Sequence, residues 1–476
     1  MRALTVISLL FLLVEAKAQD QTAFYDSLTL SDYYMANWKA LLKDGRNAAA
    51  SNSANIYTLK RMGYAAHRLK RYHSSNWWYQ KAAIIDAKDP DVLTMLYANH
   101  LELGNSQERY QAQKGMSFEL QQYLGLRKIP VLDYGFAEFC AAPNNNEKRN
   151  GNLQKSQFNA ARPATRFSQF LNEPIYYWSA GLNFNLKKKG QLLFQYSGFS
   201  SAIVQREQLL GLRQTGTIKV DGNNEPVYLR VDSSLTNKYH LQQHQFYLAL
   251  KLLTKNNTLV VPYLHGMLNF SSPFVVNATS AELHVQPNPA SLTTVPVFEI
   301  NKPAQVSGGL TLGILAGRQL RQLWIDGNLS YTYFNTRSFV QATLGVAWSP
   351  FGNLKLVVAP RFSYVYVAGE SRAIASLQVS SQLHRLVYIS ASGGYGDRSN
   401  TTEAAGSLNF FGADHMAWFA GASLYIPVLK NLHVYTSYQF RAMQSENLLY
   451  IRPDIFGKVT TNYNTHLISI GLKFLL

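Results

Sequence analysis

The chain has 476 residues and a formal net charge of +17, with 47% hydrophobic, 13% aromatic and only 15% charged residues. A disordered chain needs more charge and fewer aromatic residues, so this composition excludes disorder as the dominant state. No run of about 18 or more apolar residues occurs in the chain, which excludes a bundle of membrane-spanning helices.

Residues 1–18 have the pattern of a secretory signal peptide. Arg2 supplies a positive start, residues 3–14 are apolar, and small side chains at Ala16 and Ala18 mark the expected cleavage site. The apolar stretch, about 12 residues long, is too short to span a bilayer. We therefore expect export of residues 19–476. Cys140 is the only cysteine, so the exported chain is not a disulfide scaffold.

Residues 19–128 predict a helical domain, because apolar residues recur every three or four positions and only Pro90 interrupts them. The stretch 59–90 resembles the tetratricopeptide family, whose period is about 34 residues. A shift by this period places Leu93 under Leu59, whereas Gln113 falls under Tyr79, so one repeat matches well and the second matches in part. The residues expected to pack the paired helices are Gly63, Ala66, Tyr72, Tyr79 and Ala82.

Tetratricopeptide-like repeats offer a groove to a peptide or a protein. The resemblance therefore implies a protein partner for residues 19–128. The alternative is a helical hairpin domain that packs only on itself.

From residue 130 to 476 the pattern changes to an alternation of apolar and polar residues, which predicts strands. We count about 14 strands, with 12 to 16 possible, each about as long as a tilted strand that crosses a bilayer. The range reflects segments near 203–206 and 228–231, which can extend loops as hairpins. The strands are expected to begin near residues 131, 175, 191, 241, 259, 306, 323, 339, 354, 373, 387, 416, 432 and 465.

The connections between these strands alternate in length. Short turns at 255–257, 349–353 and 430–431 alternate with long polar loops such as 202–238 and 443–463. This alternation is typical of outer-membrane barrels, whose short turns face the periplasm. With an even number of strands, both ends of the barrel lie at the short-turn rim. The domain at 19–128 is then expected in the periplasm.

The end of the chain supports this interpretation. The apolar residues Ile470, Leu472, Phe474 and Leu476 alternate to the last position. This pattern resembles the C-terminal signal that the barrel-assembly machinery of Gram-negative bacteria recognises, although Leu476 stands where that signal usually has an aromatic residue. Residues 130–476 therefore resemble Gram-negative outer-membrane β-barrel proteins. The resemblance implies a mainly β fold, a transmembrane antiparallel up-and-down β-barrel preceded by an α-helical tetratricopeptide-like domain, with outer-membrane lipid and the assembly machinery as partners.

The excess of positive charge has two expected locations. In a cytoplasmic protein it would indicate nucleic acid, but the export signal argues against that partner. Lysine and arginine at a rim attract anionic headgroups; the candidates are residues 187–189, Arg318, Arg321 and Arg385. Basic residues in the lumen would favour anionic solutes, unless loops or side chains plug it. The lumen-lining candidates are Lys251, Asp326, Lys355, Arg361, Gln439 and Arg441.

Enzymatic motifs are absent from the sequence. His240 and His244 lie four residues apart without a carboxylate nearby, and there is no Gly-x-Ser-x-Gly elbow, zinc-ligand spacing or glycine-rich phosphate loop. We therefore expect no catalytic, cofactor or metal site. The predicted function is an outer-membrane channel or exporter whose periplasmic helical domain docks a partner protein. A structural or assembly protein anchored by its barrel is the alternative, and a barrel hydrolase is the least favoured.

The combination of an export signal, periplasmic helical repeats and a C-terminal barrel also resembles the exopolysaccharide-export porins. Those proteins carry many more repeats than this chain, so the resemblance implies an export role for the barrel without indicating a substrate.

Overall fold

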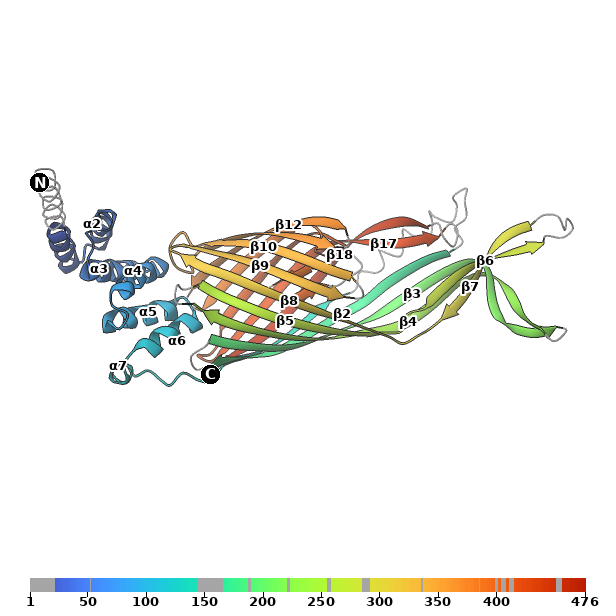
Figure 1. The fold of residues 1–476 in the computed structure, drawn as a ribbon, viewed down its shortest axis with the longest axis horizontal. Helices are drawn as coiled ribbons and strands as arrows, with labels where there is room; N and C mark the ends of the chain where they lie inside the picture. Colours follow the sequence, from blue (N-terminus) through green and yellow to red (C-terminus); the bar gives the residue numbers. More distant parts are fainter. Residues whose placement is uncertain are drawn as a thin grey trace, which may run out of the picture.

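The computed structural model describes a helical domain at one end of a long barrel, from which extended strands project at the other end (Figure 1). The described residues are 22–476, apart from 52, 144–165, 187–189, 221–222, 255–257, 285–291, 335–336, 368, 385, 399–400, 404–407, 411–414 and 451–455. The predicted signal peptide at 1–18, the lysine turn at 187–189 and Arg385 lie outside them. We call the barrel opening next to the helices the helical-domain mouth, and the opposite opening the distal mouth.

The helical domain consists of antiparallel helices with local signals at their ends. Asn55 accepts a hydrogen bond from the Thr58 backbone N–H, and Asp89 accepts from Asp91 and Val92, with Pro90 in the first helical turn. Residues 22–34 are helical, and the helices that follow are α2 (Trp38–Ala50), α3 (Ile56–Arg68), α4 (Tyr72–Ile85), α5 (Pro90–Glu102), α6 (Ser106–Gly115) and α7 (Phe118–Tyr123).

The core of this domain lies where α3 packs against α4. A Cβ atom added at Gly63 would lie 2.6 Å from the Tyr79 ring, so only glycine permits this approach. Ala66 and Ala82 are fully buried and Tyr79 is 2% exposed. Tyr72 lies at the first position of α4, half-buried, with its ring 5.4 Å from that of His67. Four of the five predicted packing residues therefore meet in one contact, and Tyr72 lies at its edge.

Fourteen of the described strands between Leu132 and Leu475 form a closed antiparallel barrel. Fourteen strands follow one another around the ring, and β18 pairs with β1, for example at Phe139 and Ile470, to close it. The predicted fold class is confirmed. The ring consists of β1 (Leu132–Ala142), β2 (Arg166–Leu186), β3 (Gly190–Val220), β4 (Asn223–Leu253), β5 (Thr258–Ser271), β8 (Gln305–Leu320), β9 (Leu323–Phe334), β10 (Arg337–Trp348), β11 (Val357–Val367), β12 (Glu370–His384), β13 (Val387–Tyr395), β16 (His415–Pro427), β17 (Leu432–Tyr450) and β18 (Phe456–Leu475).

Some of the predicted loops are strands instead. β3 and β4 pair residue by residue from Gln191 and Lys251 to Val220 and Asn223, so the expected loop at 202–238 is wrong. The expected loop at 443–463 largely continues the pairing of β17 with β18. Pairing with the partner strand satisfies the backbone groups that face it, which is why these segments continue the ladder. A second hairpin, β6 (Val275–His284) and β7 (Leu292–Asn301), pairs with β3, and β14 (Thr401–Glu403) pairs with β15 (Leu408–Phe410).

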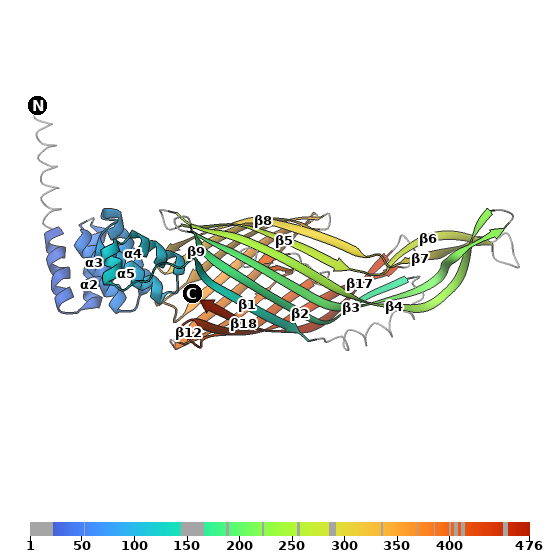
Figure 2. The ribbon, with the colours of Figure 1, turned by 90° about the horizontal axis from the view of Figure 1, so that it is seen from below.

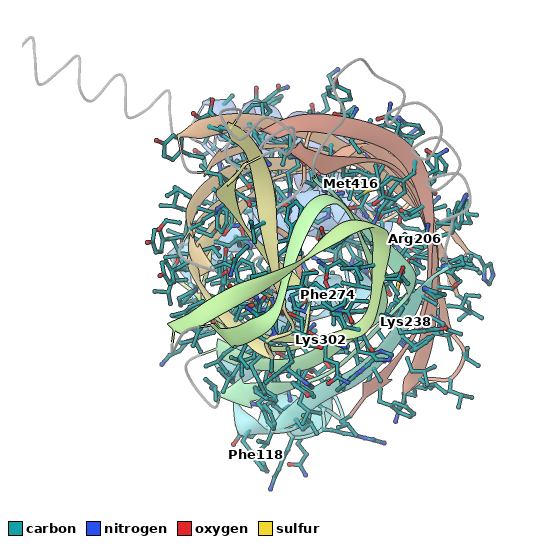
Figure 3. All side chains as sticks on the ribbon, turned by 90° about the vertical axis from the view of Figure 1, so that its right-hand side faces the viewer. Phe118, Arg206, Lys238, Phe274, Lys302 and Met416 are labelled. Atoms are coloured by element: carbon teal, nitrogen blue, oxygen red, sulfur yellow. The ribbon has the colours of Figure 1, made fainter. Side chains whose placement is uncertain are left out.

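The long hairpins pack together at the distal mouth. Gln205 is fully buried and binds both backbone groups of Phe274: its Nε2 donates to the carbonyl at 2.9 Å, and the Phe274 N–H donates to Oε1 at 2.6 Å. Phe298 and Val276 form a small apolar core beside them. In the view from this end, Lys238, Phe274 and Lys302 lie within the outline of the barrel (Figure 3). Part of the distal mouth is therefore covered by the chain itself.

The outer face of the barrel is apolar and the inner face is polar. On β8, Leu310, Leu312 and Ile314 are 46%, 52% and 47% exposed, whereas Thr311 between them is 1% exposed. On β18 the predicted assembly residues Ile470, Leu472, Phe474 and Leu476 are all exposed. An exposed apolar belt around a closed barrel is the arrangement of a transmembrane β-barrel. None of the described helices is long and apolar enough to cross a membrane.

Candidate functional site

The inner wall of the barrel is lined by polar side chains that bind one another. The Thr311 and Thr332 hydroxyls lie 2.8 Å apart, and the Tyr263 hydroxyl donates to Asn328 Oδ1 at 3.0 Å. The Tyr263 ring passes over Gly313, where an added Cβ would lie 2.2 Å from it. Tyr247, Tyr263 and His265 are at most 5% exposed. Aromatic side chains of β4 and β5 therefore occupy part of the interior.

Asp326 and Arg361 form an ion pair on this wall. Arg361 Nη2 lies 3.2 Å from Asp326 Oδ1, and the Trp324 indole N–H donates to Oδ2 at 3.1 Å. Gly345, on the strand between them, leaves room for the carboxylate. The Asp326 side chain is 5% exposed, whereas that of Arg361 is 44% exposed. Arg361 therefore presents a positive charge to the solvent-accessible part of the interior.

Gln439 and Arg441 lie together on β17. The Arg441 Nε donates to Gln439 Oε1 at 2.5 Å. Arg441 is the register partner of Phe419, and the guanidinium of Arg398 lies 4.1 Å from the centroid of that ring. Arg398 thus lies against the Phe419 ring, and Arg441 is opposite Phe419 on the neighbouring strand, toward the distal half of the barrel.

The other two lumen candidates lie near the helical-domain mouth. Lys251 is opposite Gln191, at the end of β4. Lys355 is not on a strand: it lies exposed in the turn before β11, so its predicted place in the lumen is wrong. The side chain of Asn353 accepts a hydrogen bond from the Lys355 backbone N–H at 3.0 Å. This turn delays the start of the strand to Val357.

Asp133, which the sequence reasoning did not select, is the centre of a hydrogen-bond cluster at this mouth. Its carboxylate is 4% exposed. The Tyr110 hydroxyl donates to Oδ1 at 2.7 Å and the Ser106 hydroxyl to Oδ2 at 3.1 Å, both from α6. Asn183 and Gln191 of the barrel each donate to Oδ2 at 3.1 Å. We call this cluster the Asp133 anchor.

The first turn of α6 supports the anchor electrostatically. Ser106 is the first residue of α6, so the carboxylate of Asp133 lies near the positive end of the helix dipole. Gln107 Nε2 donates to the Lys251 carbonyl at 3.2 Å. Burial raises the pKa of the neighbouring Glu108 carboxyl, and the positive charge of Lys251 partly offsets that rise in pKa. Burial raises the pKa of Tyr110 to about 12, and the hydrogen bond to Asp133 is the second-largest cause of this rise.

A second contact joins the helical domain to the turn between β10 and β11. The His73 backbone N–H donates to the Gly352 carbonyl at 2.9 Å, which satisfies one of the free donors at the start of α4. Asn353 Nδ2 donates to the Lys70 carbonyl at 2.9 Å. Gly352 has φ +67° and lies against Arg71, so a tight turn places its carbonyl there. We call this contact the Gly352 anchor.

The turn between β8 and β9 adds a cation–π contact. The guanidinium of Arg321 lies 4.1 Å from the centroid of the Trp77 ring. Arg321, expected to face lipid headgroups, therefore binds the helical domain, whereas Arg318 is exposed on the outer face of β8.

The two anchors lie nearly opposite each other on the ring. The Asp133 anchor involves β1, β2 and β3, while the Gly352 anchor lies between the eighth and ninth strands of the fourteen. Both side views place the helices at the end of the barrel, beyond the short turns (Figures 1 and 2). The helical domain therefore lies across the mouth.

A third charged cluster lies at the distal end. His415 Nδ1 lies 2.6 Å from Asp397 Oδ2, and Arg372 forms an ion pair with the same carboxylate. Its members lie on separate strands and loops, so sequence spacing gave no signal for it. Of the two histidines noted in the sequence, His244 binds the Tyr196 hydroxyl at 2.7 Å. Among the described residues, no group of three His, Cys, Asp or Glu is placed to hold a metal ion.

No protein-family model matches the chain, and no curated protein sequence matches it. Among solved structures, the toluene transporter TodX of P. putida is similar with 8% identity and a TM-score of 0.40, over 73% of this chain and 91% of that one. A FadL homologue of Pseudomonas aeruginosa has 8% identity and a TM-score of 0.39, over 73% and 90%. The KdgM porin has 11% identity and a TM-score of 0.27, over 50% and 96%. The barrel assignment rests on the strand pairing of this chain.

Proposed function

We propose that this chain is an outer-membrane channel for small polar solutes, with its helical domain on the periplasmic side. The observation that carries the proposal is a charged, polar interior inside a closed barrel whose outer face is apolar. Buried charges cost free energy unless partners or solvent satisfy them, and a barrel that serves only as an anchor does not need them. The ion pair of the buried Asp326 carboxylate with Arg361, whose side chain is 44% exposed, is the clearest case.

The position of the short turns supports the orientation. They lie at the end of the barrel that carries the helical domain, and short turns of outer-membrane barrels face the periplasm. The exposure of Ile470, Leu472 and Phe474 on β18 supports the proposal that an assembly machinery reads the last strand. Outer-membrane lipid and that machinery are therefore the partners we propose for the barrel.

The interior charge supports a preference for anions. Arg398 lies against the Phe419 ring, Arg441 is the register partner of Phe419, and Arg361 faces solvent although it pairs with Asp326. Basic side chains in a narrow pore attract anions, because the field is less screened there than in bulk water.

Planar bilayers test both statements. Purified full-length protein should give discrete current steps, and its reversal potential under a salt gradient should show anion preference. Replacing Arg441 with Gln should reduce that preference, while Lys43→Gln on the exposed surface of α2 should leave it unchanged. A cation-selective reversal potential would contradict the anion preference, and complete absence of current would contradict the channel.

The proposal includes a periplasmic partner protein for the helical domain. The ends of α3 and α4 that point away from the barrel expose Tyr57, Ile84 and Ile85, which are 63%, 84% and 59% exposed. A photo-crosslinking side chain at Ile84 should capture one discrete protein in cells, whereas the same probe at exposed Lys43 should not. Equal labelling at both positions would contradict a defined docking surface.

The second candidate is a structural or assembly protein anchored by its barrel. The packed residues Tyr247, Tyr263 and His265, together with helices across the mouth, favour it. A barrel that stays sealed in every bilayer recording would make this the better description.

A further inference from the structure

We propose that the helical domain is a releasable cap, which closes the helical-domain mouth while both anchors are formed and opens it when the cap leaves. This inference rests on the channel function proposed above. It concerns a contact within the chain, between α6 and Asp133 and between the start of α4 and Gly352.

The first support is geometric. A domain fixed to one side of a ring leaves the rest of the mouth open. Here the Asp133 anchor is on the first three strands and the Gly352 anchor lies after the eighth of fourteen, so the domain bridges the ring. Ser106 and Gln107 reach inward-facing Gln191 and the Lys251 carbonyl. The first turn of α6 thus enters the path that a solute would take.

The second support is the chemistry of the contact. Permanent interfaces resemble a domain core and are predominantly apolar. Each apolar cluster found in the described residues lies wholly within the helical domain or wholly within the barrel. The anchors consist of hydroxyl, amide and carboxylate groups, all of which water can satisfy after separation. The contact is therefore suited to repeated opening.

The third support is that the open state keeps Asp133 satisfied. Asn183 and Gln191 belong to the barrel and continue to donate to its carboxylate when α6 leaves. Lys251 and Lys473 lie close enough to attract its charge. Opening therefore leaves no buried charge without a partner. An unpaired buried charge is the usual reason why breaking a polar contact costs so much free energy. The barrel residues can therefore satisfy Asp133 both with α6 docked and with α6 released.

The connection to the barrel permits the movement. Residues 124–131 join α7 to β1 without regular structure, and Gly125 has φ +60°. Asn185 of β2 binds the carbonyls of Pro130 and Val131, and Gln113 of α6 binds that of Arg127, so residues 128–129 form the hinge between barrel and cap. Because this connection ends next to Asp133, the cap stays tethered on that side after α6 is released, and its side at the Gly352 anchor moves furthest.

A disulfide across the Gly352 anchor tests the proposal in the full-length chain. An added Cβ at Gly352 would lie 3.4 Å from the Arg71 Cβ, close to the separation of about 3.5–4.5 Å found in disulfides. The variant is Arg71→Cys with Gly352→Cys, in a Cys140→Ser background that removes the only native cysteine. Its reduced form is the matched control, because the same chain then lacks only the covalent bond.

In planar bilayers, oxidation should lower the open probability, and reduction should restore it, with the size of the single-channel step unchanged. Conversely, Ser106→Ala with Tyr110→Phe should raise the open probability by about tenfold or more, because the loss of even one hydrogen bond to a charged group has that effect. Tyr57→Phe, which removes a hydroxyl at the far end of the domain, should not change it.

The outcomes separate the two proposals. Current that is indifferent to oxidation would overturn the cap and leave the channel intact. A changed step size without a changed open probability would mean that these residues only shape the pore, and would also overturn the cap. Absence of current from every form, including the reduced and the anchor-weakened chains, would overturn the channel and the cap with it.

Discussion

The helical domain makes two kinds of contact, one within itself and one with the barrel. Within the domain, Met62, Tyr79 and Val92 form a buried apolar cluster. Against the barrel, the same domain offers hydroxyls, an amide and the start of a helix to a carboxylate and a carbonyl. We therefore expect folding of the domain and docking of the domain to be separate events. The domain should keep its fold in conditions that release it from the barrel.

The largest effect is expected in the apolar cluster. Met62 is fully buried, and Met62→Ala should destabilise the domain by about 3 kcal/mol through lost burial and a cavity. Loss of the helical circular dichroism signal on heating measures it, since the barrel contributes strand signal instead. Lys43→Ala on the exposed surface of α2 is the control. A loss no larger than that of the control would mean that the cluster is not the core.

The second-largest loss of stability is expected when the pH is lowered. Burial lowers the pKa of His100 to about 3, with the nearby His73 charge as a second cause, and lowers the pKa of His73 to about 4. The unfolded chain, with histidine pKa values near 6.5, then binds more protons, so stability is lost as the pH falls below about 6.5. At pH 5 His100 alone should account for about 2 kcal/mol. His100→Gln should flatten the melting temperature between pH 7.5 and 5, and an unchanged slope would contradict this origin.

The contact between the helical domain and the barrel should be weakened by single side-chain changes that leave the domain folded. Tyr110→Phe removes one hydrogen bond to the Asp133 carboxylate, which lowers the free energy of opening by about 1.5 kcal/mol. Amide hydrogen exchange of α6 should become faster, while that of α3 should stay the same. Equal acceleration of exchange in both helices would show that docking and folding are one event.

The smallest effect belongs to the cation–π contact. Arg321→Gln removes a guanidinium that lies 4.1 Å from the centroid of the Trp77 ring, and contacts of this kind contribute about 0.5–1 kcal/mol at exposed sites. The same exchange experiment measures it near the start of α4. A loss as large as that of Tyr110→Phe would mean that Arg321 is a third anchor.

The barrel was predictable because its signal is local. Each strand alternates within its own residues, so strand starts such as Leu323, Val387 and Leu432 were found in place. The length of β3 and β4 was underestimated because their pairing with each other along one hairpin, rather than alternation, sustains them. Lys355 was misplaced because a side-chain bond from Asn353 shapes the turn before the strand.

The contacts between the helical domain and the barrel had no such local signal in the sequence. Tyr110 and Asp133 look like ordinary surface residues in the sequence, and only the pairing of β1, β2 and β3 brings Asn183 and Gln191 to the same carboxylate. Residues Gly63, Ala66 and Ala82, in contrast, belong to two neighbouring helices and follow a helical spacing, so their small size was informative.

Asp133 has one further role in the molecule. Its backbone carbonyl accepts a hydrogen bond from the N–H of Leu476, the last residue, at 3.1 Å. Asp133 therefore joins two contacts, since its side chain binds α6 and its backbone binds Leu476. Any change in how Leu476 sits against β1 would therefore also move the carboxylate on which α6 docks.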